Sequence, residues 1–379
     1  MHYTAMQTWA WVHKWSSLVC TAFLLMLCLT GLPLIFHDEI DEFFSPSDWQ
    51  PANPGAELMS LDQIVRIAQD NRPGERPLYL SFDIDRPVVN VTTAPPTDSN
   101  QPDFHLMPYD LTSGDQVPLP EDASSAVMHF LLQLHTDMFL GLPGMLFLGF
   151  MGLLFAVATV SGIVLYAPFM RKIPFGTLRR EKSRRLLWLD YHNLLGVVTI
   201  VWALLVGLTG VVNTLEEPII DGWRNAELAD LIAQHQSVES SEHWASVDEA
   251  VASALTLAPD MEPQFIAFPG ARYSTPGHFA VFLHGRTPVT EHIVSPVLVN
   301  ARTGEVEGRR EMPWYAKTLA LSGPLHFGDY GGMTLKVIWA LLDLVLIAVL
   351  ISGLYLWLKR GTGRSKVTSD LQSLEEQTA

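Results

Sequence analysis

The feature that most constrains this chain is the length of its charge-free stretches. No Asp, Glu, Lys or Arg occurs between Lys14 and Asp38, nor between Asp137 and Arg171. About 20 apolar residues suffice for a helix to cross the hydrocarbon core of a bilayer. Because lipid offers no hydrogen-bond partners, only helices and closed barrels satisfy their backbone there. These stretches therefore predict membrane-spanning helices, an integral membrane α-helical fold.

Four spanning helices are expected. They are Trp15–Phe36, a helix within 138–170, Asn193–Leu215 and Thr334–Leu358. Gly141-Leu142-Pro143-Gly144 is expected to separate the second helix from a preceding segment. The first span is long for a secretory signal and no small-residue cleavage site follows it, so we expect it to be retained.

The charges between the spans predict their orientation. The short connection 171–185 holds seven Lys and Arg residues. The long segments 37–134 and 216–325 carry 17 acidic against 4 basic residues and 15 against 7. The positive-inside rule puts the short loop and both termini in the cytoplasm and the long segments outside. The net charge of −16 also argues against a nucleic-acid partner.

Residue spacing indicates an internal duplication. In each half, two of the histidines are followed at matching distances by a hydroxyl residue and a glycine. The spacing is 17 residues from His13 to Thr30-Gly31 and from His192 to Thr209-Gly210, and 26 residues from His135 to Ser161-Gly162 and from His326 to Ser352-Gly353. Two spans per half keep both copies the same way up, which predicts parallel tandem repeats about an axis along the membrane normal.

The long outer segments carry matching signals for helices and strands. Ser60 and Ser246 are N-cap candidates for short helices. Alternating residues at 87–91 and 278–282 predict strands. Turn signals occur at Thr112-Ser113-Gly114-Asp115 and Arg302-Thr303-Gly304-Glu305. These patterns therefore predict one outer α+β module in each half of the chain.

The four histidines form two pairs of matched depth. His13 and His192 fall at the cytoplasmic ends of spans one and three, whereas His135 and His326 fall just outside spans two and four. A two-fold axis can bring each pair face to face, and two imidazoles supply both axial ligands of a six-coordinate haem iron. We therefore predict two bis-His haem b groups near opposite faces, which would relay electrons across a core about 30 Å thick.

Other metal sites are less consistent with the pattern. A histidine at a membrane boundary is often simply interfacial, and a zinc site needs three or four converging ligands. Cys20 and Cys28 share one apolar run, which excludes a disulfide scaffold and a Cys-based metal site, and no C-x-x-C-H motif for covalent haem occurs.

Several charged and outer residues have two interpretations. Lys14, Arg184 and Arg185 are candidates for pairing with haem propionates, or are positive-inside anchors. Burial of Asp343 in the membrane is costly, so Asp343 is a candidate for a proton relay or for pairing with another helix. Alternatively, Lys336 and Asp343 only define a late start of the apolar run. Six outer histidines are candidates for contact with a ferric substrate, or are solvated surface residues: His37, His105, His129, His278, His284 and His292.

Over nearly its whole length the chain resembles the PepSY-associated transmembrane proteins, which include bacterial inner-membrane ferric-siderophore reductases. The resemblance rests on His13-Lys14-Trp15, Leu134-His135, Tyr191-His192-Asn193-Leu194-Leu195-Gly196, Leu325-His326 and the two outer modules, which look like PepSY modules. Family members often have Arg after these histidines, whereas this chain has Lys14, Thr136, Asn193 and Phe327.

The resemblance implies an inner-membrane enzyme similar to a ferrioxamine reductase, which reduces a periplasmic Fe(III)–siderophore and releases Fe(II) for uptake. The electron donor is expected to be quinol or a cytoplasmic reductase. The expected divisions are 1–37 (first span), 38–134 (first module), 135–170 (His segment and second span), 171–191 (basic loop), 192–215 (third span), 216–325 (second module), 326–358 (His segment and fourth span) and 359–379 (cytoplasmic tail).

Three other functions fit parts of the pattern. A PepSY-type regulatory or binding protein would use its spans only as an anchor and would be colourless. A cytochrome b subunit would bind haem but pass electrons to another protein. A transporter with alternating access is the least consistent, because charges within the spans are sparse.

Overall fold

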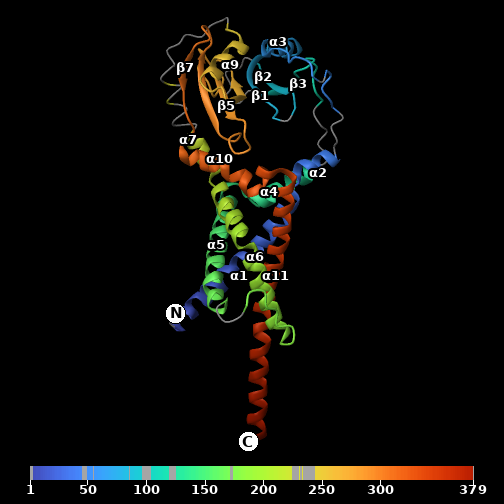
Figure 1. Ribbon diagram of the computed structural model, residues 1–379, viewed down its shortest axis with the longest axis vertical. Coiled ribbons are helices and arrows are strands. Elements are labelled where there is room, and N and C mark those ends of the chain that lie inside the picture. Colours follow the sequence, from blue (N-terminus) through green and yellow to red (C-terminus); the bar gives the residue numbers. More distant parts are fainter. Residues whose placement is uncertain are drawn as a thin grey trace. The chain divides into compact units, whose positions relative to one another are not determined.

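The computed structural model describes residues 3–44, 49–53, 55–84, 86–95, 104–118, 125–170, 174–223, 230, 233 and 244–378 (Figure 1). The chain divides into two compact units. The helical unit comprises Met1–Asp41, Ser124–Leu215 and Ser322–Ala379, and the sheet unit comprises Glu42–Ala123 and Glu216–Leu321.

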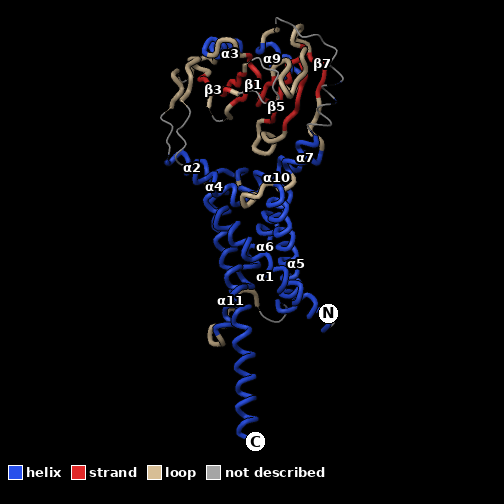
Figure 2. The backbone as a smooth tube through the Cα atoms, turned by 180° about the vertical axis from the view of Figure 1, so that it is seen from behind, coloured by secondary structure: helices blue, strands red, loops and turns tan. Residues whose placement is uncertain are grey.

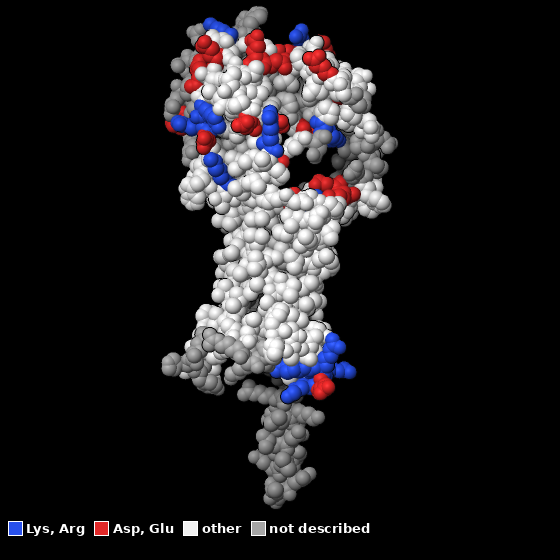
Figure 3. Space-filling view, viewed as in Figure 1, with Lys and Arg blue, Asp and Glu red and all other residues white. Residues whose placement is uncertain are grey.

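Four long helices build the helical unit. They are α1 (Tyr3–Leu34), α5 (Leu142–Met170), α6 (Arg184–Asn213) and α11 (Gly332–Thr378). Within the described residues these are the four helices long and apolar enough to cross a membrane, which confirms the predicted number of spans. Large apolar side chains such as Val201 (78% exposed) and Leu29 (62%) point away from the bundle. Figure 3 shows a middle zone of this unit almost without charged residues, with Lys and Arg gathered at one end.

Two spanning helices begin earlier than their charge-free stretches. Helix α1 already starts at Tyr3, so His13 lies almost three turns inside it. Helix α6 starts at Arg184 behind the N-cap Ser183, so His192 lies two turns inside it. Neither leading segment contains Gly or Pro, so nothing in the sequence interrupts the helix.

Two short helices carry the other histidines. Helix α4 (Ser125–Thr136) ends just after His135, and α10 (Trp314–Phe327) ends just after His326. The predicted break before the second span is confirmed: α4 ends at Thr136, Gly141 has a φ of 62°, and α5 begins at Leu142. The helical unit includes residues 125–134 of α4 and 322–325 of α10, which the sequence divisions assigned to the outer modules. Other short helices are α2 (His37–Phe44), α7 (Glu216–Trp223) and the 3-10 turn η2 (Asp329–Gly331).

The sheet unit is built on one antiparallel sheet of seven strands (Figure 2). The strands are β1 (Arg76–Phe82), β2 (Val88–Ala94), β3 (His105–Asp110), β4 (Met261–Ala267), β5 (His278–Gly285), β6 (Val294–Asn300) and β7 (Val306–Arg309), in the order β3-β2-β1-β4-β5-β6-β7. Strands β1 and β4 pair at Tyr79↔Ala267, Leu80↔Ile266 and Ser81↔Phe265. The two predicted α+β modules therefore share a single sheet.

Helices α3 (Leu61–Asn71) and α9 (Val247–Thr256) begin as the sequence predicts. Ser60 Oγ accepts a hydrogen bond from the Gln63 amide in a capping box, and Ser246 Oγ accepts one from the Glu249 amide. Both helices contribute buried residues to one apolar core together with alternate sheet residues such as Leu80 and Ile266, each 0% exposed. This core explains the alternating pattern of the strands.

The two helices also cap one another. Asp248 on α9 accepts hydrogen bonds from the amides of Leu61 (2.9 Å) and Asp62 (3.1 Å) on α3. Asp62 in turn accepts from the Val247 amide (2.9 Å) and from the Ser246 hydroxyl. Carboxylates satisfy the unpaired amides of a helix N-terminus and interact favourably with its dipole. These crossed caps join the two halves of the chain.

Asp248→Ala is expected to weaken the start of α3, because the amides of Leu61 and Asp62 lose their acceptor. Loss of a cap costs roughly 0.5–2 kcal/mol, which corresponds to about two- to thirty-fold faster local exchange. Hydrogen exchange of the peptide around residues 58–66 in the whole protein measures this. Asp70→Ala, at an exposed position of the same helix, is the control. Equal exchange in both variants would contradict the capping role.

Candidate functional site

The structure brings the four predicted histidines together as two facing pairs. In the first pair, the ring centroids of His13 and His192 lie 6.4 Å apart with an interplanar angle of 70°. In the second pair, those of His135 and His326 lie 6.3 Å apart at 68°. Each pair takes one imidazole from each half of the chain. The near-identical geometry shows that the two pairs are the same local arrangement built twice.

In three of the four imidazoles Nδ1 is bound to a backbone carbonyl of a neighbouring helix, and the fourth also has a backbone partner. Nδ1 lies 2.8 Å from Ala158 O in His13, 3.1 Å from Val349 O in His192 and 2.9 Å from Val206 O in His326, and Leu27 is the backbone partner of His135. A carbonyl oxygen only accepts, so Nδ1 carries the proton and donates. The lone pair then lies on Nε2, which is the arrangement that prepares a histidine to bind a metal.

The four hydroxyl–glycine dipeptides identified by their spacing from the histidines lie directly against the histidine rings. Ser161, Ser352, Thr30 and Thr209 place their hydroxyls 3.2, 2.9, 2.9 and 3.3 Å from Nδ1 of His13, His192, His135 and His326. A Cβ on the following Gly162, Gly353, Gly31 or Gly210 would lie 3.2, 3.3, 3.1 or 3.0 Å from Cε1 of the same ring. A side chain at these positions would force the ring to shift by a few tenths of an ångström, so glycine favours the close approach of each ring to the helix.

The two pairs are separated along the spans. Thr30, which contacts His135, follows His13 by 17 residues on α1, and Thr209, which contacts His326, follows His192 by 17 on α6. At 1.5 Å per residue this is about 26 Å along each helix. The separation is close to the thickness of a hydrocarbon core, about 30 Å.

The residues of both pairs fit a haem iron. Imidazole nitrogen binds a metal at about 2.0–2.1 Å, and ring centroids 6.4 and 6.3 Å apart leave room for one metal ion between the two rings of a pair. The described residues contain no group of three or more His, Cys, Asp or Glu that would complete a metal site. Each pair therefore offers two protein ligands, which suits a porphyrin iron with four further ligands and does not suit zinc.

Cavities surround both pairs. The cavity of the first pair has a volume of about 610 Å³ and that of the second about 210 Å³. Four residues line both cavities and form the apolar wall between them: Leu24, Phe155, Ala203 and Leu346. The site is thus two ligand-bearing spaces in one bundle, separated by hydrocarbon side chains.

Of the three predicted basic contacts, the structure brings two to the first cavity. Lys14 and Arg185 line it, whereas Arg184 is not among its lining residues. Lys14 Nζ also lies 4.5 Å from the centroid of the Trp15 ring. Arg179 lines the cavity too, and sequence reasoning placed it only in the basic loop. It donates to the Asp190 carboxylate from both its amide and its guanidinium, and this partner raises the pKa of Arg179.

The imidazoles of the second pair are neutral near pH 7. Burial lowers the pKa of His135 to about 4, with His326 adding a Coulombic contribution, and burial also lowers the pKa of His326. Neutral imidazole is the form that binds metal, because the lone pair on Nε2 is then available.

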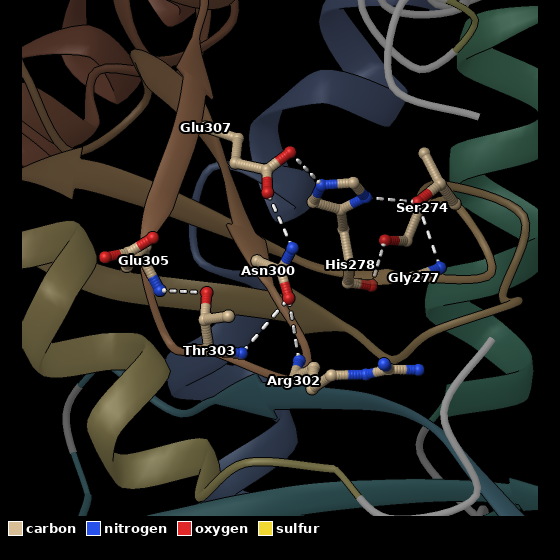
Figure 4. A network of polar contacts seen from close by, with 9 residues as sticks. Ser274, Gly277, His278, Asn300, Arg302, Thr303, Glu305 and Glu307 are labelled. Carbon is tan, nitrogen blue, oxygen red and sulfur yellow. Dashed lines mark hydrogen bonds and ion pairs between the residues drawn. The ribbon is translucent and has the colours of Figure 1, made fainter. Parts of the chain in front are cut away.

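The outer histidines differ widely in exposure. His129 on α4 is exposed, whereas His278 is fully buried. In the network of Figure 4, His278 Nε2 lies 2.8 Å from Glu307, whose other oxygen accepts from Asn300 at 2.6 Å, and Nδ1 contacts Thr275. Both ring nitrogens are thus engaged in the protein, which is inconsistent with His278 as a ligand for an external ferric substrate.

Residues 10–360 match the family model of the PepSY-associated TM region. The chain is also similar to an uncharacterized protein of Pseudomonas aeruginosa, with 31% identity over 88 residues. This alignment covers 23% of the chain and 22% of that relative.

Arg171 and Lys172 of the predicted basic loop lie outside the described residues.

Gly210→Ala is expected to displace His326, because the new Cβ would lie 3.0 Å from its Cε1. Changes to groups that orient a metal ligand typically reduce metal affinity about 10–100-fold. Titration of the haem-free protein with haem measures this at the second pair. Gly323→Ala on α10 is the control, since its Cβ would meet nothing within 4 Å. Equal haem affinity in the two variants would mean that the close approach of His326 to Gly210 is unimportant for haem binding.

Proposed function

This chain belongs to the PepSY-associated TM family, and we propose that it is a di-haem reductase of the bacterial inner membrane that passes electrons outward to an Fe(III)–siderophore and so releases Fe(II). The single observation that carries the proposal is the pair of facing imidazole pairs, each with Nδ1 bound to a carbonyl. The ferric substrate follows from the family resemblance.

The proposed orientation has both termini and the basic loop in the cytoplasm and the sheet unit in the periplasm. Basic residues at 179, 180, 182, 184 and 185 support it through the positive-inside rule. The matched contacts of the four histidines support two parallel tandem repeats, each with two spans. On this orientation the first pair lies toward the cytoplasm and the second toward the periplasm.

Each residue has a defined role in this mechanism. His13 and His192 hold the group nearer the electron donor, and His135 and His326 hold the group nearer the acceptor. When bound, each haem supplies a one-electron iron couple. The carbonyl and hydroxyl contacts at Nδ1 fix the tautomer and the ring direction. Leu24, Phe155, Ala203 and Leu346 keep water out of the path between the two cavities.

Lys14 and Arg185 are placed to pair with propionates at the first cavity. The donor is quinol or a cytoplasmic reductase. The acceptor is a chelate that holds Fe(III) through hard oxygen ligands, and the same ligands hold Fe(II) much less strongly. A single electron is therefore sufficient to release the iron.

His135→Ala is expected to reduce the haem-to-protein ratio from two to one, because only the second pair loses a ligand. The ratio is measured as pyridine haemochrome per mole of protein after expression with added haem precursor. His129→Ala is the matched control, since His129 lies on the same helix and is exposed. Colourless wild-type protein would instead favour the regulatory PepSY alternative.

Reduced protein is expected to reduce a ferric siderophore directly. Protein in lipid nanodiscs is reduced with dithionite, desalted without oxygen and mixed with ferrioxamine and an Fe(II) indicator. About two Fe(II) per protein should appear as the haem bands reoxidise, since each haem contributes one electron. The His135→Ala variant should release Fe(II) more slowly, because the site nearer the acceptor is impaired. Haem that stays reduced in the presence of the ferric chelate would indicate a cytochrome subunit that serves another protein.

A further inference from the structure

Helix α11 carries a carboxyl group inside the bundle. Asp343 is only 6% exposed. The Cys28 thiol of α1 is a hydrogen-bond partner of its carboxyl group, and Oδ2 has no hydrogen-bond partner in the part of the chain that the structure describes. A charged group within the membrane is costly without a partner, so such residues commonly mark proton or ion pathways.

The surroundings of Asp343 contain other unsatisfied polar atoms. Trp202 Nε1, Trp339 Nε1 and Asn213 Oδ1 are likewise buried without partners among the described residues. All three residues, and Asp343, line the 210 Å³ cavity that also holds His135 and His326. Buried polar atoms are normally hydrogen-bonded. Their gathering around one cavity indicates that its occupant is polar or charged.

The nearest cation on the same helix face is already neutralised. Lys336, Trp339 and Asp343 follow one another at intervals of three and four residues, so they share a face of α11. Lys336 Nζ lies 3.0 Å from Glu39, 3.6 Å from Asp38 and 3.7 Å from Asp329. Lys336 is thus engaged by three carboxylates and is not the counter-ion of Asp343.

The other helices offer no counter-ion in this cavity. Its titratable lining residues besides Asp343 are Cys28 of α1, His135 of α4 and His326 of α10. The lining residues from α5 and α6 include no Asp, Glu, Lys, Arg or His. Two neutral imidazoles and a thiol cannot balance a carboxylate. An ionised Asp343 would therefore need a balancing positive charge from the occupant of the cavity.

We propose that Asp343 is a proton acceptor coupled to the arrival of an electron at the second histidine pair. This inference rests on the proposed function. With haem bound, the ferric iron, the porphyrin dianion and two neutral imidazoles would together carry one positive charge, the propionates not counted, and this charge would balance an ionised Asp343. Addition of one electron would remove that charge and leave the carboxylate buried without a counter-ion.

The step balances with one electron and one proton. The electron reaches the second pair, and one proton from solvent bonds to the Asp343 carboxylate. When the electron passes on to the Fe(III) chelate, the O–H bond breaks and the proton returns to solvent. The cluster of Lys336 and Glu39 lies seven residues from Asp343, about 10 Å along the helix axis, and marks the end of α11 from which the proton enters.

Redox titration of the two-haem protein at several pH values tests the proposal. The midpoint potential of the haem at the second pair should fall with rising pH by up to about 59 mV for each tenfold change in proton concentration. Asp343→Asn should make that potential higher and independent of pH, because no carboxylate remains to bind a proton. Asp343→Glu should restore the pH dependence. Glu181→Gln removes an exposed carboxylate and should behave like the wild type.

Infrared difference spectra provide a readout that needs no variant. Reduced-minus-oxidised spectra of wild-type protein should show a protonated carboxyl band that shifts when aspartate is labelled with ¹³C. No such band, or an unchanged pH dependence in Asp343→Asn, would overturn the role of Asp343 and leave the di-haem function intact. Absence of bound haem in the wild type would instead reject the proposed function itself.

Discussion

The hydrogen bond from a histidine Nδ1 to a helix carbonyl is the interaction on which the candidate site depends. It is made by His13, His192 and His326 at 2.8–3.1 Å, and His135 has Leu27 as its backbone partner. This bond decides the tautomer of each ring and leaves the lone pair on Nε2. Without it an imidazole in a wide helical bundle would have several rotamers and no fixed ligand direction. In this way a neighbouring helix fixes the orientation of each ring.

The contacts that orient each ring lie within one half of the chain, whereas each pair combines one ring from each half. Ser161 holds His13 and Ser352 holds His192, yet His13 faces His192. A single half orients its two rings but does not pair them, so each pair needs both halves of the chain. The crossed caps of Asp62 and Asp248 join the halves of the sheet unit in the same reciprocal way.

The charged side chains of the helical unit differ in whether they have a partner of opposite charge. Lys336 is buried with three carboxylates around it, and Arg179 is bound by Asp190. The Asp343 carboxyl group, by contrast, has an oxygen without a partner in the described residues. Buried ion pairs are tolerated when each charge is satisfied. The contrast is the reason that Asp343 is assigned a function and Lys336 a structural one.

Most of the architecture was predictable, because it follows from local patterns. Charge-free length predicted four spans, Gly141 marked the break before α5, and Ser60 and Ser246 were recognised as N-caps. The equal spacing of histidines also predicted which rings belong together. Each of these features depends on neighbours in sequence or on periodicity, both of which a single chain displays.

The rest required the folded chain. Residue spacing identified Thr30-Gly31 and its three counterparts as recurring dipeptides. It did not show which histidine ring each one contacts, because those contacts join residues more than 100 positions apart. The fusion of two modules into one sheet depends on the β1–β4 pairing, which is equally distant in sequence. The sequence by itself determined the spans, the caps and the pairing of histidines. Only the tertiary structure decided ring direction, the neutralisation of Lys336 and the isolation of Asp343, because these depend on which groups from other helices come within a few ångströms.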